Sequence, residues 1–312
     1  MIAVIVPIYN TEKYLRETID SVICQTLSFA EHIRLILLDD ASTDGSFAIC
    51  EQYQKQYPKQ ILVKHYDTNQ GVSALRNEGV RIAGEMGDEL ITFLDSDDKL
   101  ADDAMEKTVQ YFDAHEDVFV AAIGIRYFDA YEGEQRLNWR FEKTDVVDIK
   151  KDYTYPHYYV GGVFLRHAVL DELHFDESLS FWEDALAVNQ VIVSQGKYGL
   201  IAGTHYYYRK REDESSLVDT AWHKKERYTT LLSSGYGQLF AYSRKKHHRI
   251  IPYVQYMVAY HMRLMMMKSK QRIIEEILSE DELAALRDDV QKVLKKQRIR
   301  RYNDHNEKEE AR

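Results

Sequence analysis

Short apolar runs alternate with longer amphipathic segments through the first hundred residues of the chain. Apolar runs bounded by polar turn-forming residues are typical of buried strands, and the segments between them have helical spacing. This alternation predicts βαβ units, right-handed crossovers and a mainly parallel sheet flanked by helices. The predicted strands are Ile2–Val6, Arg34–Leu38, Ile61–His65 and Leu90–Leu94, and the predicted helices are Glu12–Thr26, Gly45–Tyr57 and Val72–Ala83.

The pattern becomes mixed after the fourth predicted strand. Val118–Phe128 favours a further strand, and Gln135–Phe141 alternates apolar and polar residues like an exposed antiparallel strand. Later segments predict a helix and then two short strands, followed by helices to about residue 296. These segments are Leu186–Ser194, Tyr198–Ala202, His205–Tyr208 and the region after Trp222.

This pattern predicts three parts. Residues 1–218 form an α/β domain, residues 219–297 form a helical extension, and the charged residues 298–312 form a disordered tail or linker. Helical spacing of Tyr253, Met257 and Tyr260 indicates packing or self-association of the extension, so a homo-oligomer or a further C-terminal domain is a candidate partner.

Composition narrows the class of protein. A chain of 312 residues that is 45% hydrophobic can bury a large core, and its net charge of -10 argues against nucleic-acid binding. Only Cys24 and Cys50 are present, which supports neither a disulfide framework nor a zinc site. The apolar start at Met1–Pro7 lacks a charged leader, and Ile250–Met267 is interrupted by Pro252 and Arg263. We therefore expect a cytoplasmic protein without a membrane span.

A basic run at residues 244–249 has two interpretations. Such runs are usually solvated helix ends, but this one could also contact anionic lipid. Peripheral contact with the inner face of the membrane therefore stays open at this point.

Polar clusters follow each of the first four predicted strands, at residues 7–11, 39–44, 67–71 and 95–98. Because the carboxyl ends of parallel strands meet at one edge of a sheet, these clusters are expected to converge on a shared crevice. In the last of them, Asp95-Ser96-Asp97-Asp98, carboxylates could hold Mg2+ or Mn2+ against a diphosphate, since oxygen ligands favour these ions over zinc. The alternative is a turn or a helix cap.

Two further clusters carry charge that a nucleotide could use. Asp39 and Asp40 are adjacent acids whose repulsion needs compensation, and a carboxylate there could accept hydrogen bonds from a base or a ribose. Asn69 precedes a helix start that presents Arg76 about one turn later, which suits a phosphate or a pyrimidine carbonyl. Either position could instead serve only the local fold.

Glu183 and Asp184 follow two aromatic residues and open a predicted helix. A carboxylate that is partly desolvated and lies near another acid has a raised proton affinity, as a general base requires, although helix capping explains the pair equally well. Downstream, Arg209, Lys210 and Arg211 could close over a diphosphate as a mobile lid, or could form a solvated loop.

Taken together, these residues resemble the family-2 glycosyltransferases of the GT-A fold. The resemblance covers residues 1–218 and rests on Pro7-Ile8-Tyr9-Asn10, Asp39-Asp40, Arg76-Asn77, Asp95–Asp98 and Glu183-Asp184, in the order of the family. The Tyr-rich basic segment with Ser215-Ser216 is similar to that of bacterial enzymes that modify wall teichoic acid or build capsular polysaccharide. The membrane helices and the basic motif of the processive synthases are absent from the sequence.

The resemblance implies a role for each matching position. The donor nucleotide would lie among Pro7, Tyr9, Asp40, Asn69, Arg76 and Asp95, the metal on Asp97, and the diphosphate under Arg209, Lys210, Arg211, Ser215 and Ser216. Asp184 would be the catalytic base.

The expected function is inverting transfer of a hexosyl or N-acetylhexosaminyl group. The donor would be a UDP-sugar, assisted by Mn2+ or Mg2+, and the acceptor would be teichoic acid, capsular polysaccharide or a lipid-linked molecule at the cytoplasmic side of the membrane. The alternatives are a non-catalytic nucleotide-sugar-binding scaffold and a nucleotidyltransferase, although no basic Gly-rich loop for a triphosphate is present.

Overall fold

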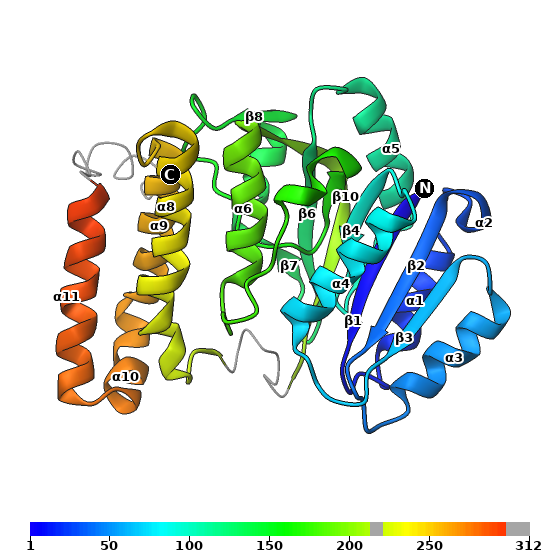
Figure 1. Ribbon diagram of the computed structural model, residues 1–312, viewed down its shortest axis with the longest axis horizontal. Coiled ribbons are helices and arrows are strands. Elements are labelled where there is room, and N and C mark those ends of the chain that lie inside the picture. Colours follow the sequence, from blue (N-terminus) through cyan, green and yellow to red (C-terminus); the bar gives the residue numbers. More distant parts are fainter. Residues whose placement is uncertain (213–220, 298–312) are drawn as a thin grey trace.

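A computed structural model describes residues 1–212 and 221–297 of the chain. Its centre is a mixed sheet with helices on both faces, and the C-terminal helices lie beyond α6 at one end (Figure 1). The strands are β1 Ile2–Ile8, β2 Ile33–Asp39, β3 Ile61–His65, β4 Leu90–Phe93, β5 Lys99–Leu100, β6 Val120–Asp129, β7 Gly133–Glu134, β8 Val146–Asp148, β9 Val163–Arg166 and β10 Lys197–Lys210. The α-helices are α1 Leu15–Ile23, α2 Phe29–His32, α3 Ser46–Gln56, α4 Val72–Glu85, α5 Ala104–Ala114, α6 Glu183–Gln195, α8 Tyr236–His247, α9 Pro252–Met265, α10 Lys268–Ile277 and α11 Glu280–Gln297.

The strand order is β3-β2-β1-β4-β9-β6-β10-β5, with β7 paired to β6 and β8 paired to β10. The first four strands are parallel, as the alternating pattern predicts. The sheet becomes mixed because β9, a strand that the apolar pattern did not reveal, lies antiparallel between β4 and β6. The two strands predicted at 198–208 are one strand, β10, with a register shift between Ile201 and His205.

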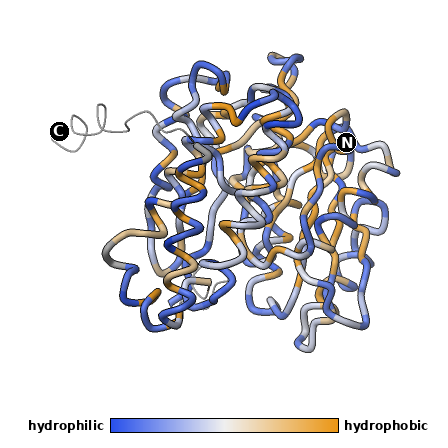
Figure 2. Tube along the Cα trace, turned by 60° about the vertical axis from the view of Figure 1, so that its left-hand side comes forward, coloured by the Kyte–Doolittle hydropathy of each residue, from blue (hydrophilic) through white to orange (hydrophobic). Residues whose placement is uncertain are grey.

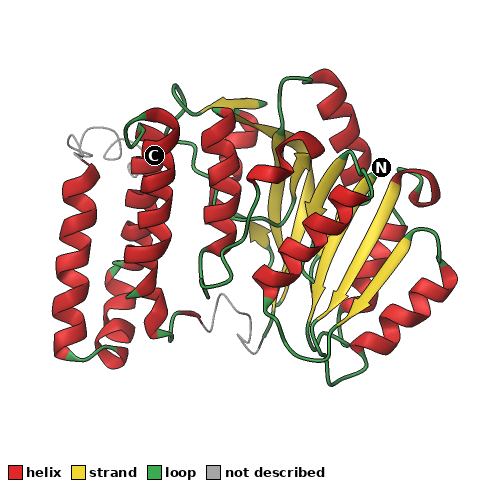
Figure 3. Cartoon of the chain, in the orientation of Figure 1, coloured by secondary structure: helices red, strands yellow, loops and turns green. Residues whose placement is uncertain are grey.

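Alternation along the strands divides the interior into two layers. Ala3, Ile5 and Ile36 face the layer that contains α4, α6 and the C-terminal helices. Val4, Val6 and Leu35 face the layer that contains α1, α3 and α5. Figure 3 distinguishes the helices from the strands of the sheet that they flank, and Figure 2 shows hydrophobic residues concentrated in the interior of the chain.

The predicted exposed strand at Gln135–Phe141 is wrong. Residues Arg136–Glu142 form the 3-10 helix η1, and Arg140 within it is fully buried. Its Nε donates to the carbonyl of Leu137 three residues earlier, and Nη1 donates to the Tyr198 hydroxyl at 2.9 Å. A buried guanidinium needs such oxygen partners, so its hydrogen bonds override the weak alternating pattern.

The remaining short helices are η2 His167–Glu172, η3 Lys225–Arg227 and the π-helix η4 Leu231–Gly235. The predicted helical region after Trp222 is confirmed by η3, η4 and α8–α11. Within the described residues, no helix is both long enough and apolar enough to cross a membrane. The predicted domain boundary at 218/219 and the predicted tail at 298–312 lie outside the described residues.

Candidate active site

The loops that follow β1 and β2 are hydrogen-bonded to each other at the carboxyl edge of the sheet. The Asn10 amide donates to the Ser42 hydroxyl at 3.0 Å, and the Thr43 amide donates to the Asn10 side-chain oxygen at 2.8 Å. Asn10 and Ala41 both adopt left-handed backbone conformations, with φ values of 52° and 60°, which turn the chain sharply after each strand. Beside these turns, Pro7 is half-buried and the Tyr9 ring is 51% exposed.

The adjacent acids at the end of β2 have separate partners, which resolves their repulsion. Asp39 bonds to His65 Nδ1 at 2.7 Å, whereas Asp40 accepts the backbone amides of Gln70 and Gly71 at 2.6 and 2.9 Å. Asn69 Nδ2 lies 3.4 Å from the Asp40 carbonyl oxygen. Asp40 therefore fixes the loop that begins α4, so any contact between its carboxylate and a nucleotide would have to share these hydrogen bonds.

Arg76 connects the end of β4 to the start of α6. Its guanidinium bonds to Asp95 at 3.1 Å and to Glu183 at 3.0 Å, and the residue is only 5% exposed. These contacts join segments that are 107 residues apart in the sequence. The predicted convergence of the acidic clusters on one crevice agrees with this arrangement.

Asp184 is a half-buried carboxyl group in the first turn of α6. Burial and the neighbouring Glu183 carboxylate raise its pKa to about 7, and the Arg76 cation offsets part of this rise. The preceding Trp182 is buried with a φ of 71°, an uncommon conformation for a bulky residue. A carboxyl group that changes protonation near neutral pH can accept a proton from a hydroxyl group during catalysis.

The acidic residues shortly after β4 differ in burial, and the more buried one is held by hydrogen bonds within the protein. Asp98 is buried and bonds to the Tyr206 hydroxyl and the Arg209 amide, both at 2.7 Å. Asp97 is half-buried, and its Oδ2 accepts Arg211 Nε at 3.1 Å. Burial, followed by the Asp95 carboxylate, raises the pKa of Asp97 despite the nearby Arg211 cation.

Asp95 and Asp97 could supply some, but not all, of the ligands of a divalent cation. The described residues contain no group of three or more His, Cys, Asp or Glu side chains that could hold a metal. Mg2+ commonly uses one or two carboxylates and completes its shell with substrate phosphate oxygens and water. Asp97 and Asp95 supply such oxygen donors, and a cation would relieve the crowding of negative charge that raises the Asp97 pKa.

The basic residues at the end of β10 and directly after it have different partners. Arg209 forms ion pairs with Glu17 and with Asp129, and its Nε donates to the Asp97 carbonyl at 2.7 Å. Arg209 therefore stabilises the loop that contains Asp97. Lys210 lies over the rings of Tyr127 and Tyr208, at 5.5 and 5.0 Å, and Arg211 faces Asp97. Ser215 and Ser216 lie outside the described residues.

Sequence reasoning missed the supporting residues Glu17 and Tyr206. Glu17 bridges Lys99 and Arg209, and Tyr206 bonds to Asp98 and to the Asp95 amide. Glu17 belongs to no local motif, and Tyr206 lies in the Tyr-rich basic segment, where no supporting role was assigned to it. The pairing of β5 with β10 and the position of α1 bring both residues to the acidic loop. The single sequence signal was the run of tyrosines at 206–208.

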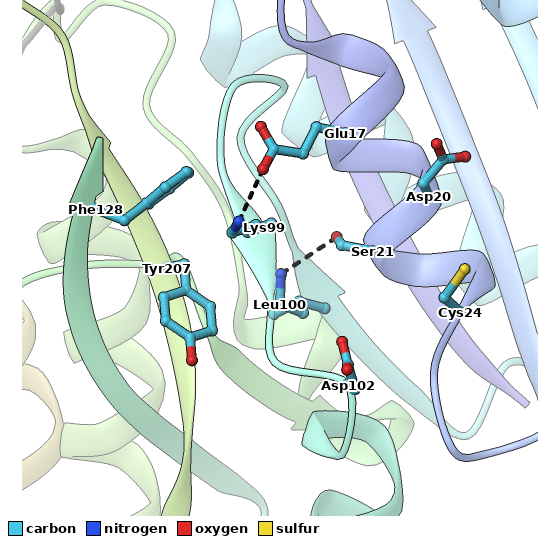
Figure 4. Close-up of a pocket in the computed structure, with 9 residues that line it drawn as sticks. All are labelled: Glu17, Asp20, Ser21, Cys24, Lys99, Leu100, Asp102, Phe128 and Tyr207. Carbon is cyan, nitrogen blue, oxygen red and sulfur yellow. Dashed lines mark hydrogen bonds and ion pairs between the residues drawn. The ribbon is translucent and has the colours of Figure 1, made fainter. Parts of the chain in front are cut away.

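A hollow of about 510 Å³ lies next to this support, between α1 and the strands β5, β6 and β10 (Figure 4). Glu17, Asp20 and Asp102 line it, with Lys99 as the only cation among the lining residues. Glu17 already pairs with Lys99 at 2.8 Å. This acidic lining disfavours a diphosphate, and Arg76 is not among the residues that line the hollow.

Comparisons with known proteins identify the family of the chain. The model of the family "Glycosyl transferase family 2" matches residues 3–174. The minor teichoic acid biosynthesis protein GgaA of Bacillus subtilis is 40% identical over 297 residues, which cover 95% of this chain and 66% of that protein. GgaB of the same organism is 36% identical over 260 residues, which cover 82% of this chain and 28% of that protein. The chain thus spans less than two thirds of the length of both relatives.

Solved structures share the fold at low sequence identity. S. aureus TarS 1-349 in complex with UDP-GlcNAc has a TM-score of 0.73 at 19% identity, covering 94% of this chain and 80% of that chain. The Pyrobaculum calidifontis mannosyltransferase PcManGT, in complex with GDP-Man and Mn2+, has a TM-score of 0.55 at 16% identity, covering 94% and 86% respectively. The architecture is therefore of the GT-A type, with a helical C-terminal region.

Proposed function

Because the chain belongs to glycosyl transferase family 2, we propose that it transfers a sugar from a UDP-sugar to a hydroxyl group of a cell-surface polymer. Similarity to the two B. subtilis teichoic acid biosynthesis proteins supports a teichoic-acid-type acceptor, with capsular polysaccharide or a lipid-linked acceptor as the other choices. The TarS complex with UDP-GlcNAc supports UDP as the donor nucleotide and an N-acetylhexosamine as a candidate sugar.

The environment of Asp184 is the observation that carries this proposal. A carboxyl group with a pKa of about 7, adjacent to Glu183 and close to Arg76, is suited to deprotonate an acceptor hydroxyl. The acceptor oxygen then bonds to the anomeric carbon as the bond to the diphosphate oxygen breaks. The leaving nucleoside diphosphate takes the electron pair, and Asp184 holds the proton. A single displacement of this kind inverts the anomeric configuration.

The nucleotide has a candidate cradle at the carboxyl edge of the sheet. The exposed Tyr9 ring offers an aromatic face for a base, next to Pro7. Asp40 and Asn69 hold the loop that begins α4, and Arg76 on α4 pairs with Asp95 and with Glu183, the neighbour of Asp184. These contacts support the proposed donor position.

Mn2+ or Mg2+ is the proposed cofactor, held by Asp97 with support from Asp95. When bound, it would neutralise charge on the leaving diphosphate. Arg211 and Lys210, together with Ser215 and Ser216, are the proposed loop over that diphosphate. Arg209 acts with them because its Nε donates to the Asp97 carbonyl and its backbone amide donates to the Asp98 carboxylate.

Replacement of the base tests the assignment. Asp184→Asn should reduce transfer by at least about a thousandfold, because the amide cannot accept the hydroxyl proton, while UDP binding should change less than about threefold. The measurement is UDP release from a panel of UDP-sugars with Mn2+, combined with calorimetric titration of UDP. Asp113→Asn, on the exposed face of α5, is the matched control and should retain activity. Weak UDP binding by the Asp184 variant would instead identify this residue as a donor contact or a structural support.

A non-catalytic scaffold that binds nucleotide sugars is the alternative function. The retained carboxylates around Arg76 favour the enzyme, because a scaffold has no need of an acid with a pKa near neutrality. A scaffold would be stabilised by UDP in a thermal-shift experiment without releasing UDP from any sugar donor. The proposed location is the cytoplasm, at the inner face of the membrane where such acceptors are assembled.

A further inference from the structure

Arg227 differs from the other buried arginines of the described chain. Arg76 and Arg209 pair with carboxylates, and Arg140 donates to carbonyl and hydroxyl oxygens. Arg227 is 4% exposed, yet its Nε and Nη1 have no hydrogen-bond partner among residues 1–212 and 221–297. Burial of a cation without an anion is costly, so these donors point to a ligand rather than to a structural ion pair.

Two aromatic rings hold this guanidinium in place. Its central carbon lies 3.6 Å from the ring centroid of Trp222 and 4.0 Å from that of Phe181. Cation–π contacts stabilise the charge on the faces of the group but leave its N–H groups unsatisfied. A planar guanidinium has two edges with paired N–H groups, one formed by Nε with Nη2 and one by Nη1 with Nη2, and either pair matches two oxygens of a phosphate or carboxylate.

The location connects this cation to the proposed base. Phe181 lies three residues before Asp184, and the neighbouring Trp182 has a second enclosed donor, Nε1, without a described partner. The rings of Phe181 and Trp182 lie 6.2 and 5.8 Å from the ring of His261 on α9. Burial, followed by the Arg227 cation, lowers the pKa of His261 to about 3, and Tyr236 bonds to its Nδ1 at 2.6 Å. Arg227 is therefore the cation next to this cluster, and Lys270 Nζ lies 4.2 Å from the ring centroid of Trp222.

We propose that Arg227 binds a phosphate group of the acceptor, adjacent to the hydroxyl that receives the sugar. This inference rests on the proposed function, in which Asp184 faces the acceptor and lies opposite the departing diphosphate. The donor side has its own cations, Arg76 and the basic residues at the end of β10, whereas Arg227 contacts Phe181, three residues before the proposed base. An anion bound there belongs to the acceptor, which identifies the substrate class as a phosphodiester-containing polymer.

Kinetics with paired acceptors test this assignment. A synthetic polyol phosphodiester and the corresponding free polyol are compared at saturating UDP-sugar. Arg227→Gln should raise the KM for the phosphodiester at least about tenfold, since it removes a charge-assisted hydrogen bond, and should leave the KM for the free polyol within about twofold. Arg227→Lys, which keeps the charge but loses the fork, should fall between Gln and wild type. Arg81→Gln, at an exposed arginine on α4, is the control and should change neither KM.

Direct binding gives a readout that does not depend on turnover. Trp222 lies against Arg227, so its fluorescence should respond to inorganic phosphate in the wild-type protein. The response should saturate and be lost in both Arg227→Gln and Trp222→Phe. Trp222→Phe shows which of the three tryptophans reports binding, and Arg227→Lys, which should weaken the response, replaces the Gln variant if that variant fails to fold.

The outcomes separate this inference from the proposed function. If wild type transfers sugar to both acceptors but Arg227→Gln weakens them equally, the residue is only a structural support and the inference is overturned. It is also overturned if Arg227→Gln weakens UDP binding as much as phosphodiester binding, because the anion would then be the donor's diphosphate. Absence of any sugar transfer by wild type would overturn the proposed function, whereas an Arg227-dependent phosphate response would still support the anion site.

Discussion

Asp184 holds its proton more tightly than an ordinary aspartate because the chain surrounds it with other acids and little water. Glu183 is its immediate neighbour, and Asp95 adds a smaller repulsion. Arg76 offsets this repulsion only in part, since it also pairs with Asp95 and Glu183. At the scale of residues, one guanidinium thus offsets part of the repulsion among three acids, and the pKa of Asp184 still stays raised to about 7.

The pH profile of transfer follows from this balance. Because only the deprotonated carboxylate is a base, and its pKa is raised to about 7, kcat/KM should rise about tenfold per pH unit below pH 7 and level off above it. Glu183→Gln removes the nearest negative charge, so the rise should move to lower pH. Initial rates between pH 5 and 9 check this, and an unmoved profile in the Gln variant would show that another group controls the rate.

At the scale of elements, α4 is the connection between the sheet and α6. Arg76, near the start of α4, pairs with Asp95 after β4 and with Glu183 at the start of α6. The exposed Arg81 instead pairs with Glu78 and Glu85 on its own helix. Arg76→Met should lower the free energy of unfolding by about 3 kcal/mol, because it leaves Asp95 and Glu183 without a cation in a buried site. Arg81→Met should cost less than about 1 kcal/mol. Urea denaturation of the two variants compares the sites, and equal losses would contradict the bridging role.

The same helix approaches β1 closely at Gly79. A Cβ at this position would lie 2.3 Å from the Cγ2 of Ile5, whereas one at Gly84 would meet only Leu170 Cδ1 at 4.0 Å. Gly79→Ala should therefore destabilise the protein by about 1–3 kcal/mol through overpacking. Gly84→Ala should be neutral or stabilising by up to about 1 kcal/mol, since alanine favours the helix. Thermal denaturation of both variants distinguishes a packing constraint from a general effect of glycine replacement.

At the scale of the whole molecule, the hydrophobic layer above the sheet continues into the C-terminal helices. It includes Leu186 of α6, Leu239 of α8 and Tyr253 of α9, and the Tyr253 hydroxyl bonds to Asn189 of α6 at 2.8 Å. The element that begins with the proposed base is thus packed against the helical extension. The helical extension therefore supports the position of α6.

A charge introduced into this layer should disrupt both folding and transfer. Leu239 is fully buried, so Leu239→Asp should destabilise the protein by about 4 kcal/mol or more and reduce activity with it. Leu294 on α11 is 43% exposed, and Leu294→Asp should leave the melting temperature and activity close to those of the wild type. Full activity in a Leu239→Asp protein would show that the helical extension does not support the active site.

The sequence predicted the strands and helices that can be recognised from the spacing of apolar residues within the segment itself. The four parallel strands and the polar clusters at their ends follow from apolar runs and turn residues, and both were confirmed where the structure describes them. Local patterns were insufficient where long-range partners override them. Gln135–Phe141 has a strand-like alternation, but the hydrogen bonds of buried Arg140 make it a 3-10 helix, and the short β9 gains its place only by pairing with β4 and β6.

For the candidate site, the sequence predicted the residue types and their order. Carboxylates that follow an apolar strand can be recognised from the order of residues alone. Only the tertiary structure decided which charges neutralise one another. It joined Arg76 to Asp95 and Glu183, turned Arg209 toward Glu17 and Asp129, and enclosed Arg227 between Trp222 and Phe181. Proton affinity and anion binding depend on distance and burial in space, and neither quantity is set by neighbours in the chain.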